Sequence, residues 1–151
     1  MESASFDIAD RTCEITTLKS VKAGDLVNVE RSHHMMAENG GHSLYGHVDG
    51  VAEIIGWEDK GGSARATFKV PTASIRYFFP KGFIGLHGCS LTIDEIDEQN
   101  HLFTINLIPE TLRITNLSTR QVGDFLNYEI DQTTRTIVDT IRRVLAEPAA
   151  R

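Results

Sequence analysis

The 151-residue sequence has few of the features that mark secreted or membrane-spanning proteins. Its two cysteines, Cys13 and Cys89, lie far apart without the spacing of a disulfide framework, which favours a reducing compartment. The N-terminus is polar and acidic and lacks the basic and apolar stretches of a secretory signal. No run approaches the roughly 18 apolar residues that a membrane-spanning helix needs. We therefore expect a soluble, cytoplasmic protein with no membrane partner.

The sequence also has no excess of positive charge. Fifteen Lys and Arg against 21 Asp and Glu give a formal net charge of −6. Nucleic-acid binding depends on cationic groups that face phosphates, so we expect no nucleic-acid partner. Histidines at 33, 34, 42 and 47 match no metal-ligand spacing, so we expect no metal site. We expect His33, His34, His42 and His101 to be solvated or turn histidines. The 40% apolar and 24% charged residues are typical of one ordinary globular domain.

Alternation of apolar and polar residues is the strongest local pattern in the chain. It is clearest over residues 64–70, 101–107 and 124–130, and weaker over 24–30, 47–57 and 90–96. Alternation places every second side chain on one sheet face, as in half-buried strands. Turn signals such as Pro80-Lys81-Gly82 and Gly123-Asp124 separate these segments. Short strands at this spacing predict an all-β barrel or sandwich.

One long segment has helical periodicity, and it lies near the C-terminus. Over residues 135–147 the apolar positions form one stripe, and charged residues occupy the opposite face. The stripe consists of Ile137, Val138, Ile141, Val144 and Leu145. Two interpretations stay open: the helix packs on its own barrel, or it packs on another chain.

The sequence repeats itself at a constant offset of 99 residues. Gly24-Asp25 corresponds to Gly123-Asp124, and Asn28 and Glu30 correspond to Asn127 and Glu129. Thr12, Ile15, Thr16 and Leu18 also recur, as Thr111, Ile114, Thr115 and Leu117. A constant offset with a shared turn and shared strand register predicts a duplicated unit. Residues 12–30 would be the end of a first copy, and residues 42–131 a complete second copy.

Several motifs in order along the chain resemble those of the riboflavin synthase family. They are GDLVNVERS (24–32), GGH…GHVDG (40–50), KGFIG (81–85), GCSLT (88–92), NLIPETLRITNL (106–117), VGDFLNYEID (122–131) and VDTIRRVL (138–145). The resemblance implies a six-stranded antiparallel closed barrel with a C-terminal amphipathic helix. It divides the chain into a remnant of a first lumazine-binding barrel and a linker (1–33), a complete lumazine-binding barrel (34–132) and an oligomerisation helix (133–147).

The resemblance also implies a reaction. Two molecules of 6,7-dimethyl-8-ribityllumazine dismutate by four-carbon transfer to riboflavin and 5-amino-6-ribitylamino-pyrimidinedione, without a metal or cofactor. The family forms homotrimers around the C-terminal helix, with each active site between two subunits. The alternative is a single barrel that binds lumazine or flavin without catalysis, or a trimerising fragment.

A planar, neutral, amide-bearing ring with a polyol tail needs hydroxyls, amides and an apolar slot rather than a charge cluster. Ser90 and Thr92 alternate along a predicted strand and so share one face, where such residues often only decorate the surface. The resemblance favours substrate contacts for them. In full, it implies substrate binding by Gly46, His47, Val48, Lys81, Ser90, Leu91, Thr92, Asn106, Leu107, Ile108, Pro109, Glu110 and Thr111.

Three residues are candidates for catalysis: His47, Ser90 and Asp131. The transfer needs loss of a proton from the 7-methyl group, and a histidine pKa lies near neutrality. Asp131 could orient a nucleophile, or it could cap the following helix, and both interpretations are open. Cys89 is expected to be a packed thiol. His87 departs from the family, which commonly has an acidic residue in this turn.

Overall fold

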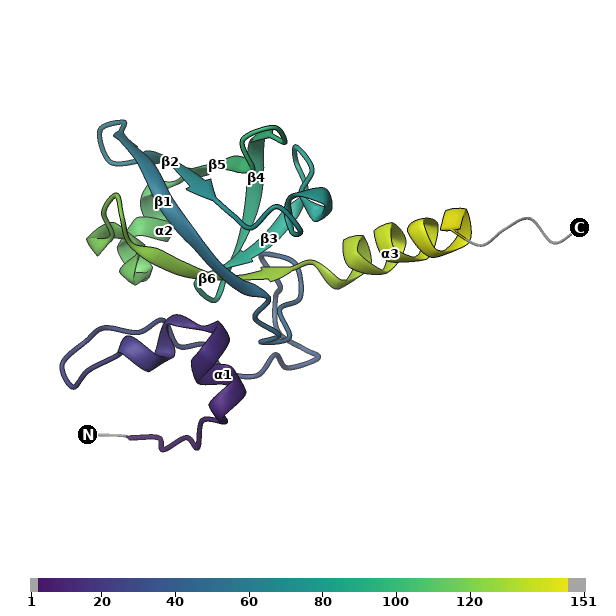
Figure 1. Cartoon of the computed structure of the whole chain (residues 1–151). Helices are drawn as coiled ribbons and strands as arrows, with labels where there is room; N and C mark the ends of the chain where they lie inside the picture. The colour runs from purple at the N-terminus through teal and green to yellow at the C-terminus, as the bar shows by residue number, and fades with distance from the viewer. Residues whose placement is uncertain (1–2, 147–151) are drawn as a thin grey trace, which may run out of the picture.

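The computed structural model describes residues 3–146, and these contain a closed antiparallel barrel (Figure 1). The strands follow the order β1-β2-β5-β4-β3-β6 around the barrel. Their bounds are β1 (Gly50–Asp59), β2 (Ala64–Lys69), β3 (Phe83–Leu86), β4 (Cys89–Asp97), β5 (Leu102–Leu107) and β6 (Phe125–Ile130). The predicted six-stranded barrel is therefore confirmed.

Inward-facing residues of the alternating strands fill the barrel. Phe68 of β2 and Phe103 of β5 stack with ring centroids 5.0 Å apart, and Phe78 meets Phe103 edge to face. Leu126, Tyr128 and the neighbouring apolar positions are also buried. The period-two pattern thus identified the buried face of β2, β5 and β6 correctly.

One predicted strand is wrong, and one observed strand was not predicted. Residues 24–30 form no strand, although their sequence alternates. Alternation alone does not create a strand, because a ladder also needs a neighbouring backbone, and this segment is held by side chains instead. Conversely, β3 spans only four residues between turns, too few for the pattern to stand out.

Short helices connect the strands and precede the barrel. They are α1 (Asp10–Ile15), η1 (Thr17–Ser20), η2 (Ile75–Tyr77), α2 (Pro109–Ile114) and η3 (Asn116–Thr119). The α2 helix begins where the sequence suggested only a strand end, with Pro109 in its first turn, a position that suits proline because its missing N–H needs no partner there.

The sequence repeat is a structural repeat. The α1–η1 unit and the α2–η3 unit occupy positions that differ by 99 residues throughout. Thr16 and Thr115 both have φ −121° and ψ 167°, and each hydroxyl accepts a bond from the N–H two residues later. The shared turns contain Gly24 and Gly123 with φ of 98° and 96°. These matches support duplication of one unit.

The two copies contact each other reciprocally. The Asn127 side-chain oxygen accepts from the Thr17 N–H at 2.8 Å, and the Asn28 oxygen accepts from the Asn116 N–H at 2.8 Å. Since residue 17 corresponds to 116 and residue 28 to 127, each copy gives the other the same bond. This self-complementary pattern is the one found at two-fold interfaces.

The C-terminal helix α3 (Gln132–Ala146) leaves the barrel and projects away from it (Figure 1). The Tyr77 hydroxyl donates to Asp139 at 2.6 Å and Val138 packs against the core, so the first turns are anchored. Farther along, Ile141 is 52% exposed and Leu145 is 80% exposed. Most of the apolar stripe therefore does not pack on the barrel of its own chain. Residue 147, the predicted end of the helix, lies outside the described residues. None of the helices within residues 3–146 has the length and apolarity needed to cross a bilayer.

Candidate functional site

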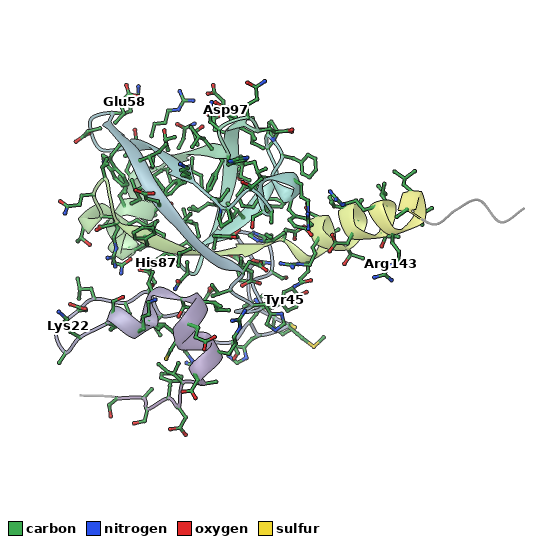
Figure 2. All side chains as sticks on the ribbon, in the orientation of Figure 1. Lys22, Tyr45, Glu58, His87, Asp97 and Arg143 are labelled. Atoms are coloured by element: carbon green, nitrogen blue, oxygen red, sulfur yellow. The ribbon has the colours of Figure 1, made fainter. Side chains whose placement is uncertain are left out.

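A cleft of about 1330 Å³ lies outside the barrel, against β3, β4 and β6. Residues 26–33 and 38–44 form one wall, and residues 88–91 and 127–129 form another. The connection through α2 and η3 closes one side with Thr111 and residues 113–116. We call this space the outer cleft. Figure 2 shows His87 where the barrel meets the N-terminal segment, with Glu58 and Asp97 at the opposite end of the barrel.

Residues 38–48, which we call the strap, cross the outer face of the barrel. In β6, the Glu129 carboxylate accepts from the N–H groups of Tyr45 at 2.8 Å and Gly46 at 2.9 Å. Glu129 is only 7% exposed, so these bonds satisfy a nearly buried charge. Register pairs Gly85 with both Glu129 and Ser90, which forms one row across β6, β3 and β4. The strap therefore lies directly over this row.

His42 is the main site residue that the sequence missed, because we expected a solvated or turn histidine there. Its backbone N–H donates to Ser90 Oγ at 2.9 Å, and its Nδ1 lies 2.5 Å from the same oxygen. Its ring stacks on Phe83 with centroids 5.2 Å apart. Burial lowers the pKa of His42, while Asp131 and Glu129 oppose that shift. The signal for this contact in the sequence was the glycine at position 41. The structure explains it, because a Cβ at Gly41 would lie 2.5 Å from Ser90 Oγ.

The residues predicted to bind substrate fall into three groups. Gly46, Val48, Ser90, Leu91 and Thr111 line the outer cleft. A second group lies along the outer faces of β4 and β5. Here Thr92 of β4 pairs with Phe83 of β3. Nearby, hydrogen bonds lower the pKa of Asp94, mainly the bond from Lys81 and secondly the bond from Asn106. Lys81 is exposed and lies 3.2 Å from Asp94.

The third group surrounds the start of α2. Ile108 and Pro109 are exposed, and the exposed Glu110 carboxylate pairs with Arg113, which lowers the pKa of Glu110. Leu107 differs from the others because it is 1% exposed and belongs to the barrel core. Its side chain faces away from the cleft, and the structure gives it a packing position instead.

The three catalytic candidates do not converge on one point. His47 is exposed, stacks near Tyr45 with centroids 6.2 Å apart, and does not line the outer cleft. Asp131 accepts from the Thr134 N–H at 2.7 Å, so it caps α3. It also lines a smaller cavity of about 350 Å³ together with His42 and Phe83. His42 lines both cavities and lies between Ser90 and the space beside Asp131.

Two further expectations concern thiol and metal chemistry. Burial, and secondarily Glu30, raise the pKa of Cys89 to about 11. A thiol with this pKa stays protonated near neutrality and is a poor nucleophile, as predicted for a packed cysteine. The residues from 3 to 146 contain no group of three or more His, Cys, Asp or Glu arranged to hold a metal ion.

Known proteins share this domain and this fold. Residues 45–131 match the lumazine binding domain family. The chain is 41% identical to the riboflavin synthase of Escherichia coli strain K12, over 94% of this chain and 66% of that protein. It is also 41% identical to the riboflavin synthase of Chlamydia muridarum, over 94% of this chain and 69% of that one. The chain thus spans about two thirds of the length of these relatives.

Solved structures agree with the sequence comparison. The fold is similar to LumP complexed with 6,7-dimethyl-8-(1'-D-ribityl) lumazine, with a TM-score of 0.70 and 26% identity over 82% of this chain and 64% of that one. It is also similar to LumP complexed with riboflavin, with a TM-score of 0.72 and 28% identity over 82% of this chain and 66% of that one. On the matching domain, the shared barrel and the similarity along most of its length, the chain belongs to the riboflavin synthase family.

Proposed function

We propose that this chain is a riboflavin synthase that dismutates two 6,7-dimethyl-8-ribityllumazine molecules to riboflavin and 5-amino-6-ribitylamino-pyrimidinedione. The observation that carries the proposal is the juxtaposition of Ser90, His42 and the strap on a domain shared with riboflavin synthases over 94% of this chain. Most of the residues that line this cleft with Ser90 are apolar, glycine, hydroxyl or amide residues, and five are charged: Glu30, Arg31, Glu38, Arg113 and Glu129. That chemistry suits a neutral, amide-bearing ring with a polyol tail.

The dimensions of the outer cleft support binding of a ligand of this class. Its volume of about 1330 Å³ exceeds the roughly 300–1,000 Å³ of common small-molecule sites. LumP, which has the same fold, was solved with the lumazine and with riboflavin. In this proposal Ser90 and Thr111 contact the ligand inside the outer cleft. Thr92 and Asn106 contact it along the adjoining outer faces of β4 and β5, while Leu107 supports these strands from the core.

Proton removal from the 7-methyl group is assigned in this proposal to His47, with Asp131 as the second candidate. His47 is exposed at the edge of the strap and could meet a ligand held by another subunit. A homotrimer through α3 would bring subunits together, and the exposed stripe of this helix supports that assembly. Two free cysteines are consistent with a cytoplasmic location.

The decisive experiment is to incubate the purified chain with the lumazine and separate the products. Riboflavin together with the pyrimidinedione in equal amounts supports the proposal. Lumazine binding by fluorescence without product would favour the alternative, a lumazine- or flavin-binding barrel without catalysis. A folded chain that neither binds nor converts the lumazine would reject both functions.

Variants of the strand hydroxyls test the location of the site. Ser90→Ala combined with Thr92→Ala should weaken lumazine binding while the barrel stays folded, because both hydroxyls lie on the outer face of β4. The matched control is Thr67→Ala on β2, which β5 separates from β4 and which does not line the outer cleft. Equal dissociation constants for the wild type and the double variant would remove these hydroxyls from the site.

A further inference from the structure

The strap holds one histidine ring in a fixed position over the outer face. Its backbone is clamped at one end by the Glu129 carboxylate, and Leu44 packs over Gly85 so closely that a Cβ there would lie 2.7 Å from Leu44 Cδ2. At the other end, the N–H of His42 donates to Ser90. The strap backbone therefore fixes where the Cα of His42 lies before the side chain makes any contact.

Stacking then fixes the orientation of the ring. The His42 and Phe83 planes differ by 12° at a centroid distance of 5.2 Å. In this orientation Nδ1 faces Ser90 Oγ at 2.5 Å, and Nε2 is buried without a hydrogen-bond partner in the described part of the chain. The two ring nitrogens are thus in different environments.

A count of donors and acceptors selects the tautomer. Burial lowers the pKa of His42, so the ring is neutral near pH 7 and carries one proton. A buried N–H without a partner is costlier and rarer than an unpaired acceptor. The proton therefore belongs on Nδ1, where it has an acceptor, and Nε2 keeps its lone pair.

Ser90 Oγ then accepts two hydrogen bonds, one from the His42 backbone N–H and one from Nδ1–H. A hydroxyl has two lone pairs and one proton, so only its proton is left for a further partner. We propose that His42 is a positioning residue that makes the Ser90 hydroxyl an obligate donor, aimed at a carbonyl oxygen of the ligand ring. The inference rests on the proposed function and adds that this side of the ring is recognised through an acceptor.

The tautomer can be tested without ligand. Nitrogen-15 NMR of the free chain should show a protonated Nδ1 and an unprotonated Nε2 at His42, with a change at Nδ1 in Ser90→Ala. This measurement does not depend on catalysis or lumazine binding, so it separates failure of the inference from failure of the proposed function. A protonated Nε2 would overturn the inference even in a chain that makes riboflavin.

Paired substitutions test the role in binding. His42→Asn places an amide N–H at the position of Nδ1, whereas His42→Gln places its amide one atom farther out. We expect His42→Asn to bind the lumazine nearly as well as the wild type and His42→Gln to bind about three- to tenfold more weakly. The controls are His34→Asn and His34→Gln, which make the same changes at an exposed histidine in the loop before the strap.

A double-mutant cycle shows whether His42 acts through Ser90. In a Ser90→Ala background, His42→Gln should cause no further loss of affinity, since the hydroxyl that it orients is gone. Additive losses, or equal losses for His42→Asn and His42→Gln with the thermal midpoints unchanged, would show a structural role only and overturn the inference.

Discussion

The burial of His87 leads us to expect that the folded chain loses stability in acid. It occupies the two-residue turn between β3 and β4 with φ 53°, followed by Gly88 with φ 84°. Burial and the charge of Arg120, whose Nη2 lies 3.3 Å from Nε2, lower the pKa of His87 to about 4. An unfolded histidine has a pKa of about 6.5. Below that value the unfolded chain binds a proton that the folded chain excludes.

The sign and size of the effect follow from this difference. Because the unfolded state binds more protons between about pH 6.5 and 4, the free energy of unfolding falls as the pH falls through that range. The pKa difference of about 2.5 units at about 1.4 kcal/mol per unit gives a full loss of about 3.5 kcal/mol, and residual solvent access reduces it to about 1–2 kcal/mol. Above about pH 6.5 the histidine has no such cost.

The assay is urea unfolding of the wild type and His87→Asn at several pH values between 4.5 and 7.5. Asparagine tolerates positive φ and keeps an acceptor for Arg120, but it does not titrate. We expect equal stability at pH 7.5 and an advantage for His87→Asn of about 1 kcal/mol at pH 5. His101→Asn is the control, because His101 also has positive φ, at 60°. Parallel pH curves for wild type and His87→Asn would refute the reasoning.

Three other substitutions test the assembly and the packing. Ile141→Asp on the exposed stripe of α3 should lower the mass measured by light scattering, whereas Arg143→Asp on the opposite face should not. An unchanged mass for Ile141→Asp would contradict assembly through this helix. Ile105→Ala should cost about 2–5 kcal/mol in urea unfolding, because it empties a fully buried position of β5; a cost near zero would mean that the barrel collapses around the gap. Asn127→Ala should cost about 1–3 kcal/mol by leaving the Thr17 N–H unpaired, and that amide should then exchange faster with solvent; unchanged exchange would argue against the reciprocal contact.

Patterns within a few residues predicted much of the fold. Period-two alternation identified the inner faces of β2, β5 and β6, because the pleat of a strand alone sends every second side chain to the same face. The 99-residue offset predicted a repeat that the two helix pairs display. Residues 24–30 have the same alternation without a ladder, because local pattern carries no information about which backbone lies alongside.

The site was harder to predict because its contacts join distant positions. His42 meets Ser90 across 48 residues, and Tyr45 meets Glu129 across 84. Only Gly40 and Gly41 and the GGH…GHVDG motif around it distinguish His42 from His34 in the sequence. Glu129 holds the strap by accepting hydrogen bonds from the backbone N–H groups of Tyr45 and Gly46. A sequence pattern does not indicate which backbone groups a carboxylate will contact.

The reciprocal asparagine contacts have a consequence for how the N-terminal segment is retained. Residues 10–30 dock on the same chain that carries Asn116 and Asn127, and a stretch that includes Met35 and Met36, each 98% exposed, joins them to the strap. A short connection of this kind gives an effective concentration of the order of millimolar. The docked segment therefore needs only about 4 kcal/mol of intrinsic affinity to stay in place. Cleavage between Met35 and Met36 would make the same contact bimolecular, and a segment with only this affinity would dissociate at micromolar protein.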